Sequence, residues 1–581
     1  LLLNLMAASG ASRGKRDVTA FLDQEVGSSL TEAERETLEA LSIHRQPVPV
    51  EALTARERDA LPSLRRKGLL IEDEDGTWTH ELLTSHFHSR LSGDRSRELH
   101  KSAAEFYLGQ MEADYWMEGL YHAVEAQDSG QVLKALSLDG EGLALAFPEE
   151  MEALLQKIRR WDGLVGSRVD VLILLALAQE ELGHETPALE TYDEILRLLD
   201  GSSDVRIALA LERKARLQAE ARRWSQAFES HERALRLYQS SGDRAGEAGE
   251  WMSLGSAHRR RGDLAKARAC FQSAWEVAER LGDLRVMAAA LNNLALVEWD
   301  DGFPSRSEPL MERSVALAHQ AEDLVGEARA LQNLSSLLRA QAREGEALQR
   351  MAEAEAAFHR AGEVEECRKA TVARAELFAD LGREAEGIEL LRKALAEPAH
   401  RTPFRRKGRG AQGEGRLREG LVRQLRECGR LDEAEQEALA LEALAVRLDD
   451  ARMAARAKIE LDAILEDEGK EGGAVEALES AREELARVGD AAGLAVVHLR
   501  LGELARKVGD RGKALRELRE AARQASLSGS LLAEASTLED LGLALEEREE
   551  RESTLRRAYE AYSQIRRRAD AERVHAYLDE G

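Results

Sequence analysis

The chain of 581 residues carries 108 acidic and 82 basic side chains, which gives a formal net charge of −26. This charge argues against general affinity for nucleic acid or an anionic membrane, because contact with phosphates would be repulsive. The chain is too long for one hydrophobic core, and its 4% aromatic residues and nine prolines are typical of a largely helical protein with several domains or repeats.

The three cysteines, Cys270, Cys367 and Cys428, have neither metal-binding nor redox spacing. The absence of a disulfide framework indicates a reducing compartment, so we expect a cytoplasmic protein. No apolar run reaches the roughly 18 residues that a membrane helix needs. The segment Leu1–Met6 lacks both a basic region and an initiator methionine, so we expect a fragment of a longer protein and not a signal peptide.

Residues 28–95 predict a small winged-helix domain. Thr31 can cap a helix, and Val50–Leu53 and Ala55–Lys67 predict two more helices. An acidic turn between residues 68–71 and 77–79 predicts a short β-hairpin. Three helices followed by a hairpin are typical of a winged helix.

Winged helices often bind DNA, so we compare the charges of the third helix and of the predicted wing with those that contact with phosphates requires. Arg65, Arg66 and Lys67 end the third helix and favour contact with phosphates. The predicted wing is acidic from Glu72 to Asp75 and opposes that contact. We therefore expect no binding of nucleic acid through this chain.

Residues 96–165 predict a helical linker. Residues 97–107 favour one helix, and Tyr115–Ala126 predicts an early, degenerate helical hairpin.

From residue 166 to residue 581 one unit of about 40 residues recurs roughly ten times. In residues 246–283 helical patterns flank Arg261-Gly262-Asp263, where the glycine can end one helix and the aspartate can cap the next. This is a helical hairpin, and nearly all units keep small residues at fixed distances from the turn. Val422 and Asp462 depart from the small position of the first helix. The predicted turn residues are Gly183, Arg222, Gly262, Gly302, Ala342, Gly382, Gly429, Gly469, Gly509 and Glu549.

The interval between the turn residues Gly382 and Gly429 is longer than the other intervals, which marks an insertion in residues 397–415. This predicts a basic surface loop on an acidic molecule, either a plain connection or a clasp for an acidic partner or phosphate. Its basic residues are Arg401, Arg405, Arg406, Lys407 and Arg409.

The repeat resembles the tetratricopeptide family. Trp251, Leu254 and Gly255 match the first half of its pattern, and Ala267, Phe271 and Ala274 match the second half. The resemblance implies an all-α superhelical solenoid whose first helices line a concave groove. In repeats three to five we expect the groove to bind a protein or a small-molecule inducer. The candidate residues are Met252, Arg259, Asn292, Trp299, Gln332 and Arg339.

The front of the chain resembles another family. Thr79-His80-Glu81-Leu82-Leu83 is similar to the Met-His-Asp motif of signal-transduction ATPases with numerous domains, a class that includes the activator of the maltose regulon. Residues 1–27 resemble the tail of the nucleotide-binding module in this class. The resemblance implies that His80 contacts the β-phosphate of ADP in the full-length protein, where ATP or ADP is the cofactor. Threonine replaces methionine and glutamate replaces aspartate here.

No phosphate-binding loop G-x-x-x-x-G-K-[ST], no zinc motif and no catalytic constellation occur in the sequence. We expect no catalytic or metal-binding residue and no cofactor in this chain itself. The hypothesis that results is a sensing and autoregulatory arm of a signal-transduction ATPase, which can oligomerise at full length. The alternatives are a stand-alone scaffold for protein assembly and a winged-helix DNA-binding regulator.

Overall fold

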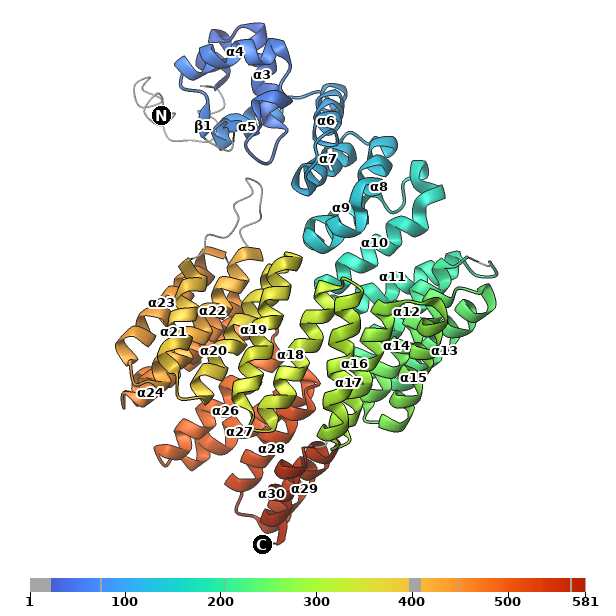
Figure 1. Cartoon of the computed structure of the whole chain (residues 1–581). Coiled ribbons are helices and arrows are strands. Elements are labelled where there is room, and N and C mark those ends of the chain that lie inside the picture. The colour runs from blue at the N-terminus through green and yellow to red at the C-terminus, as the bar shows by residue number, and fades with distance from the viewer. Residues whose placement is uncertain are drawn as a thin grey trace. The chain divides into compact units, whose positions relative to one another are not determined.

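The computed structural model describes residues 22–73, 76–202, 204–396, 409–448, 450–564 and 567–579. The chain divides into two compact units, with the boundary between residues 202 and 203. Helices dominate both units, and the first unit also contains a two-stranded hairpin (Figure 1). The all-α prediction is therefore confirmed. None of the described helices combines the length and apolarity that crossing a membrane requires.

The first two α-helices of the first unit are α3 (Glu32–Ser42) and α4 (Ala55–Arg66), each started by a capping box. The hydroxyl of Thr31 accepts from the N–H of Glu34, whose carboxylate accepts from the N–H of Thr31 at 2.7 Å. Thr54 and Glu57 repeat this arrangement. The capping role predicted for Thr31 is thus confirmed, and it satisfies backbone N–H groups that the first turn leaves free.

The predicted hairpin is present as β1 (Ile71–Asp73) and β2 (Gly76–Trp78), which pair antiparallel. Val48 exchanges two backbone hydrogen bonds of 2.9 Å with Thr77 beside it. The helix predicted at residues 50–53 is only a 3-10 turn, η3 (Val50–Ala52), because extended backbone flanks it on both sides. The helix α5 (Glu81–His88) follows the hairpin.

Three histidines join the end of α3 to α6 (Gly93–Tyr107) and α7 (Ala113–Glu125). His100 Nδ1 lies 2.8 Å from His122 Nδ1, and His122 Nε2 lies 3.2 Å from His44 Nδ1. The hydroxyl of Tyr107 also lies 3.2 Å from His44 Nδ1. Neutral rings satisfy the two histidine contacts if Nδ1 of His100 donates to Nδ1 of His122 and Nε2 of His122 donates to Nδ1 of His44.

Burial lowers the pKa of all three rings, to about 3 for His44 and about 4 for His100, and well below the usual value for His122. The cluster is therefore neutral at pH 7.

The hairpin predicted at residues 115–126 is instead the single helix α7, which packs against α6. Gly119 does not break this helix, since its missing side chain makes room for Leu108; an added Cβ would lie 2.6 Å from that side chain. The other elements of the unit are η1 (Leu22–Val26), η2 (Gly27–Ser29), α8 (Ser129–Ala146), α9 (Pro148–Ile158), η4 (Asp162–Ser167), α10 (Arg168–Glu181) and α11 (Glu185–Leu198).

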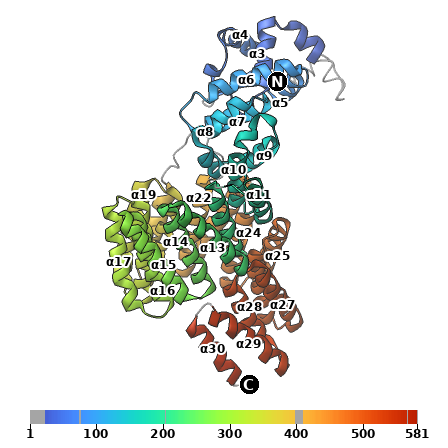
Figure 2. The ribbon, with the colours of Figure 1, turned by 90° about the vertical axis from the view of Figure 1, so that its right-hand side faces the viewer.

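The second unit is a ladder of helical hairpins, in which each first helix packs against its own second helix and against the preceding hairpin (Figures 1 and 2). Together with the pair α10 and α11, the described residues form the ten predicted hairpins. The helices of the second unit are α12 (Arg206–Glu220), α13 (Trp224–Ser241), α14 (Arg244–Arg261), α15 (Leu264–Leu281), α16 (Leu284–Asp300), α17 (Pro304–Gln320), α18 (Leu324–Ala340), α19 (Glu344–Ala361), α20 (Val364–Asp380), α21 (Glu384–Ala396), α22 (Arg409–Glu427), α23 (Leu431–Leu448), α24 (Ala451–Asp467), α25 (Glu471–Val488), α26 (Ala491–Lys507), α27 (Arg511–Ser528), α28 (Leu531–Ala544), α29 (Arg548–Gln564) and α30 (Arg568–Asp579).

The turns between the two helices of a hairpin have the left-handed backbone that the sequence predicted. Gly262 has φ of 88°, and even the non-glycine residues Arg222 and Ala342 have φ of 57° and 56°. Glycine is favoured there because it has no Cβ to clash. The prediction is wrong at Glu549, which lies inside α29, because the preceding connection leaves α28 through the extended Leu545. The remaining predicted turn residues with positive φ are Gly183, Gly302, Gly382, Gly429, Gly469 and Gly509.

The small residues allow the helices of a hairpin to approach closely. A Cβ on Gly255 would lie 2.7 Å from the ring of the buried Phe271. Asp462 departs from this rule with a fully buried carboxylate, whose Oδ2 accepts from Nε of Arg500 at 3.1 Å. Burial raises the pKa of Asp462 to about 6.

The predicted insertion falls between α21 and α22. Of its basic residues, Arg401, Arg405, Arg406 and Lys407 lie outside the described residues, and Arg409 begins α22.

Candidate functional site

The first helices of consecutive hairpins form one continuous surface, which we call the inner face. Besides packing in hairpins, these helices contact one another along much of the ladder. A surface on which neighbouring helices meet so closely is the side toward which a helical solenoid curves, and solenoids use that side for binding. The contacting pairs are α12 with α14, α14 with α16, α16 with α18, α20 with α22, α22 with α24, α24 with α26, and α26 with α28.

The six groove residues predicted from the sequence all lie on α14, α16 and α18, but several stabilise the ladder. Met252 packs against the apolar cluster around Phe271. Asn292 accepts a hydrogen bond of 3.0 Å from Asn333, one repeat later. Gln332 is half-buried on α18. Met252 and Asn292 therefore connect neighbouring repeats.

The two predicted arginines form ion pairs with the next repeat. Nε of Arg259 lies 2.6 Å from Oδ2 of Asp300, and Nε of Arg339 lies 2.6 Å from Oδ2 of Asp380. Arg339 also reaches Glu376 on the same helix as Asp380, at 3.4 Å. Each arginine is thus held between two first helices of the ladder.

The ionic contacts continue along the inner face. Glu376 also lies 3.4 Å from Arg423, which in turn lies 3.9 Å from Glu460. The pattern joins α18, α20, α22 and α24 through alternating charges, so the inner face is strongly polar in its middle. Since these side chains are partly exposed, each pair contributes only about 0.2–1 kcal/mol to stability.

A hollow of about 500 Å³ opens on the inner face where α22, α24 and α26 meet. Its floor is apolar, and two arginines of α24 and three carboxylates stand around it. The lining consists of Glu419, Arg452, Ala455, Arg456, Ile459, Glu460, Leu485, Asp490, Ala492, Gly493 and Val496.

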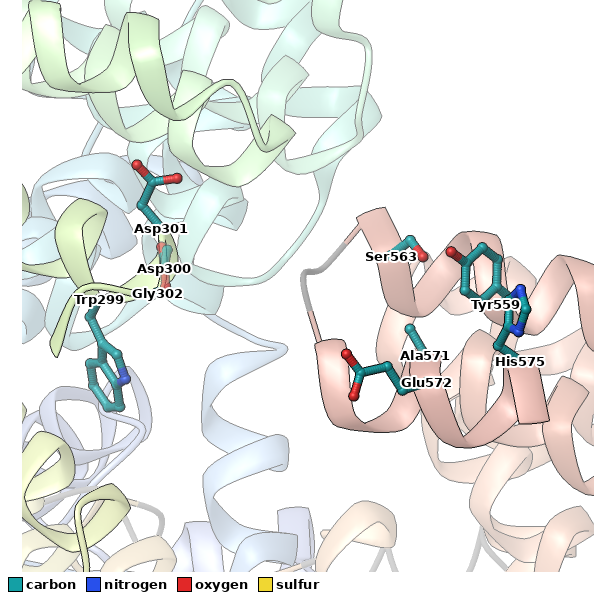
Figure 3. Close-up of a pocket in the computed structure, with 9 residues that line it drawn as sticks. All are labelled: Trp299, Asp300, Asp301, Gly302, Tyr559, Ser563, Ala571, Glu572 and His575. Atoms are coloured by element: carbon teal, nitrogen blue, oxygen red, sulfur yellow. The ribbon is translucent and has the colours of Figure 1, made fainter. Parts of the chain in front are cut away.

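A second hollow, of about 630 Å³, is lined by Trp299 and the following turn on one side and by α29 and α30 on the other (Figure 3). Trp299 packs against the apolar cluster of α16 to α20 and is half-buried. Asp300 is engaged by Arg259 and Asp301 by Arg268. On the far side Tyr559 and His575 stack edge to face with centroids 5.5 Å apart.

His80 lies in the first unit as the N-cap of α5. Its ring is exposed, and Nδ1 accepts from the N–H of Leu82 at 3.3 Å. Because Nδ1 accepts, a neutral ring carries its proton on Nε2, where it can donate to an outside acceptor such as a phosphate oxygen. The neighbouring Thr79 is buried, and its hydroxyl bonds that of Thr84 at 2.7 Å.

Among the described side chains, no group of three or more His, Cys, Asp or Glu residues is placed to hold a metal ion.

The tetratricopeptide repeat family model matches residues 286–359, which cover nearly all of α16 to α19. The chain therefore contains a tetratricopeptide repeat domain. No curated protein sequence matches the chain.

Several solved structures are similar to this chain at low identity. One is a signal transduction ATPase with numerous domains from Pyrococcus horikoshii, which has a tetratricopeptide repeat sensor; identity is 14%, the TM-score is 0.41, and 83% of this chain and 67% of that chain are covered. Yeast Tom70 is 13% identical with a TM-score of 0.40, over 78% and 96% of the two chains. A Rap protein complexed with competence and sporulation factor is 14% identical with a TM-score of 0.36, over 62% and 94%. Similarity at this level transfers no function to this chain.

The sequence placed the binding region on α14 to α18, whereas the hollow with exposed charge and apolar floor lies on α22 to α26. The consensus match is weaker there, as the departures at Val422 and Asp462 show. The available signal was the pair Arg452 and Arg456, whose spacing puts both on one helix face.

Proposed function

We propose that the inner face of the second unit binds the signal that this protein senses, an inducer or a partner protein. One observation carries the proposal: the hollow on α22, α24 and α26 lies on the surface along which consecutive first helices meet. It offers apolar area beside charged groups, as small-molecule sites generally do.

We further propose that this chain is the sensor arm of a signal-transduction ATPase, with a winged helix in residues 28–95 and a nucleotide-binding core that precedes Leu1. The motif around His80 and the order of the elements support this. The exposed ring of His80, oriented by Leu82, fits a contact with the β-phosphate of ADP. Bound ADP supplies the negative charge that a donor at Nε2 would recognise.

In such a switch the ligand acts only through its difference in affinity for the closed and open states. Every tenfold preference for the open state shifts the equilibrium by about 1.4 kcal/mol. The nucleotide contact of His80 would favour the closed state, and ligand on the inner face would oppose it.

The proposal can be tested with two matched tryptophan substitutions in the full-length protein. The induced response and the basal output of each variant are measured in the source organism. Ser336 is exposed on the inner face of α18, and Gln349 is exposed on the second helix α19. Ser336→Trp should reduce the induced response and leave basal output and thermal stability unchanged, while Gln349→Trp should behave as wild type. Equal responses of the two variants would contradict a binding role of the inner face.

The DNA-binding alternative receives less support from charge. Arg65 pairs with Glu72 of the hairpin, and Nζ of Lys67 lies 2.7 Å from Glu34. A gel-shift assay at physiological salt should therefore detect no complex between the chain and duplex DNA.

A further inference from the structure

The hollow on α22, α24 and α26 exposes two arginines that form no hydrogen bond with the described residues. Arg452 and Arg456 lie four residues apart on α24, so their side chains project from one face of the helix. Their side chains are 66% and 43% exposed. With the described residues they form ion pairs only through Nε, at 3.5 Å to Asp490 and at 3.3 Å to Glu419.

The carboxylates of the hollow are less accessible than these arginines. The side chains of Glu419 and Glu460 are only 15% and 19% exposed, and each faces an arginine. Burial raises the pKa of both carboxyl groups. Asp490 caps α26 by accepting from the N–H of Gly493 at 3.0 Å. A ligand that enters from solvent therefore meets the guanidinium groups before the carboxylates.

The floor between these groups is aliphatic. Ile459 packs on the apolar core of α24 to α26, and Val496 is 45% exposed beside it. Ala492 and the buried Ala455 also line the hollow and add no polar side-chain atoms. An exposed valine at this place gains stability when an apolar ligand covers it, at about 25 cal/mol for each Å² removed from water.

We infer that this hollow binds a free aliphatic carboxylic acid, whose carboxylate pairs with Arg452 and Arg456 and whose chain covers Ile459 and Val496. A guanidinium group offers two parallel N–H donors that match the two oxygens of a carboxylate. The volume of about 500 Å³ is in the range of small-molecule sites and suits an unbranched acid of medium length. The inference rests on the proposed role of the inner face as the sensing surface and names its ligand class.

Calorimetric titration of the whole chain with octanoate tests the inference. Octanamide has the same chain without the charge, and octylammonium has the opposite charge. We expect saturable binding of octanoate and at least tenfold weaker binding of both analogues. Equal binding of octanamide, or tighter binding of octylammonium, would overturn the assignment of an anionic ligand.

Two variants locate the site. Arg452→Gln with Arg456→Gln should weaken octanoate binding at least tenfold, while the same change at the exposed pair Arg519 and Arg523 on α27 should leave it unchanged. Val496→Asn, which alters an exposed side chain without removing charge, should also weaken binding. Unchanged affinity in both hollow variants would overturn the site.

The two proposals fail in different ways. If octanoate does not bind, yet the Ser336 substitution abolishes the induced response of the full-length protein, the ligand class is wrong and the sensing face remains. If octanoate binds as expected, but Arg452→Gln with Arg456→Gln leaves the induced response of the full-length protein unchanged, the sensing role of the hollow fails and the site remains.

Discussion

Acid should destabilise the packing of α6 and α7 against the end of α3, because the folded protein holds His44, His100 and His122 as neutral rings. The pKa of His44 is about 3 and that of His100 about 4, whereas the unfolded chain titrates near 6.5. The folded protein therefore binds fewer protons, so this contribution to stability is complete above pH 6.5. It decreases as the pH falls toward the folded values.

The magnitude follows from the same shifts. At about pH 5 the unfolded chain has protonated both rings while the folded chain has protonated neither, which costs about 2 kcal/mol for each of His44 and His100. His122 shifts in the same direction and adds to this loss. A total of about 4 kcal/mol or more is a large part of the 5–15 kcal/mol that typically stabilises a domain.

The second unit contains carboxyl groups whose pKa shifts have the opposite effect on stability: acid stabilises the fold there. Burial raises the pKa of Asp462 and Asp540 to about 6, so the folded state binds more protons than the unfolded state between that value and about 4. Lowering the pH from 7 to 5 should stabilise the fold by about 1 kcal/mol for each of them.

Hydrogen–deuterium exchange, measured as protection factors at pH 7 and at pH 5, separates the effect of the histidines from that of the two aspartates. Protection in α6 and α7 should fall at the lower pH, whereas protection in α24 and α28 should hold or rise. His100→Asn should reduce the pH dependence in α6 and α7, and His319→Asn, at a side chain that is 72% exposed, should leave it unchanged. Equal protection of α6 and α7 at both pH values would refute the reasoning.

Three further predictions concern the ladder. Gly255→Ala should lower the free energy of urea unfolding by about 1 kcal/mol, since the new Cβ meets Phe271. Gly249→Ala on the same helix has free space around the new Cβ and should raise the free energy of unfolding by about 0.5–1 kcal/mol. The same sign for both variants would be inconsistent with close packing at Gly255. Asp462→Ala should raise the melting temperature at pH 7, because it removes a buried carboxylate. It should have little effect at pH 5, where the carboxyl group with a pKa of about 6 is mostly protonated. A lower melting temperature at pH 7 would disprove this. Arg339→Ala should cost at most about 1 kcal/mol, less in high salt; a salt-independent loss would mean that packing dominates there.

The periodic features of the fold could be predicted from the sequence. A left-handed turn that favours glycine and a small residue where two helices meet closely, as at Gly262 and Gly255, leave a local signature in most repeats. The prediction was wrong where geometry depends on neighbouring segments. Residues 50–53 form only one turn between extended residues, and the last connection does not use Glu549.

The candidate site was less predictable, because side-chain partners come from other repeats. The sequence placed Arg259 and Arg339 on the inner face, but their carboxylate partners lie 41 residues further along the chain. Exposure decides which arginines remain available, as Arg452 shows, and exposure depends on the packing of three helices. The histidine cluster was missed for the same reason, since His100 and His122 come from two helices, α6 and α7, and His44 from the segment that follows α3, far apart in sequence.

The central claim is that this chain is the sensing arm of a nucleotide-dependent switch. The ADP content of the purified full-length protein and its dissociation rate, measured for the wild type and for His80→Ala, test this most directly. We expect bound ADP in the wild type and at least tenfold faster release from the variant, because one charge-assisted hydrogen bond to phosphate is lost. A full-length protein that binds no ADP, or whose ADP release is the same in both, would contradict the account.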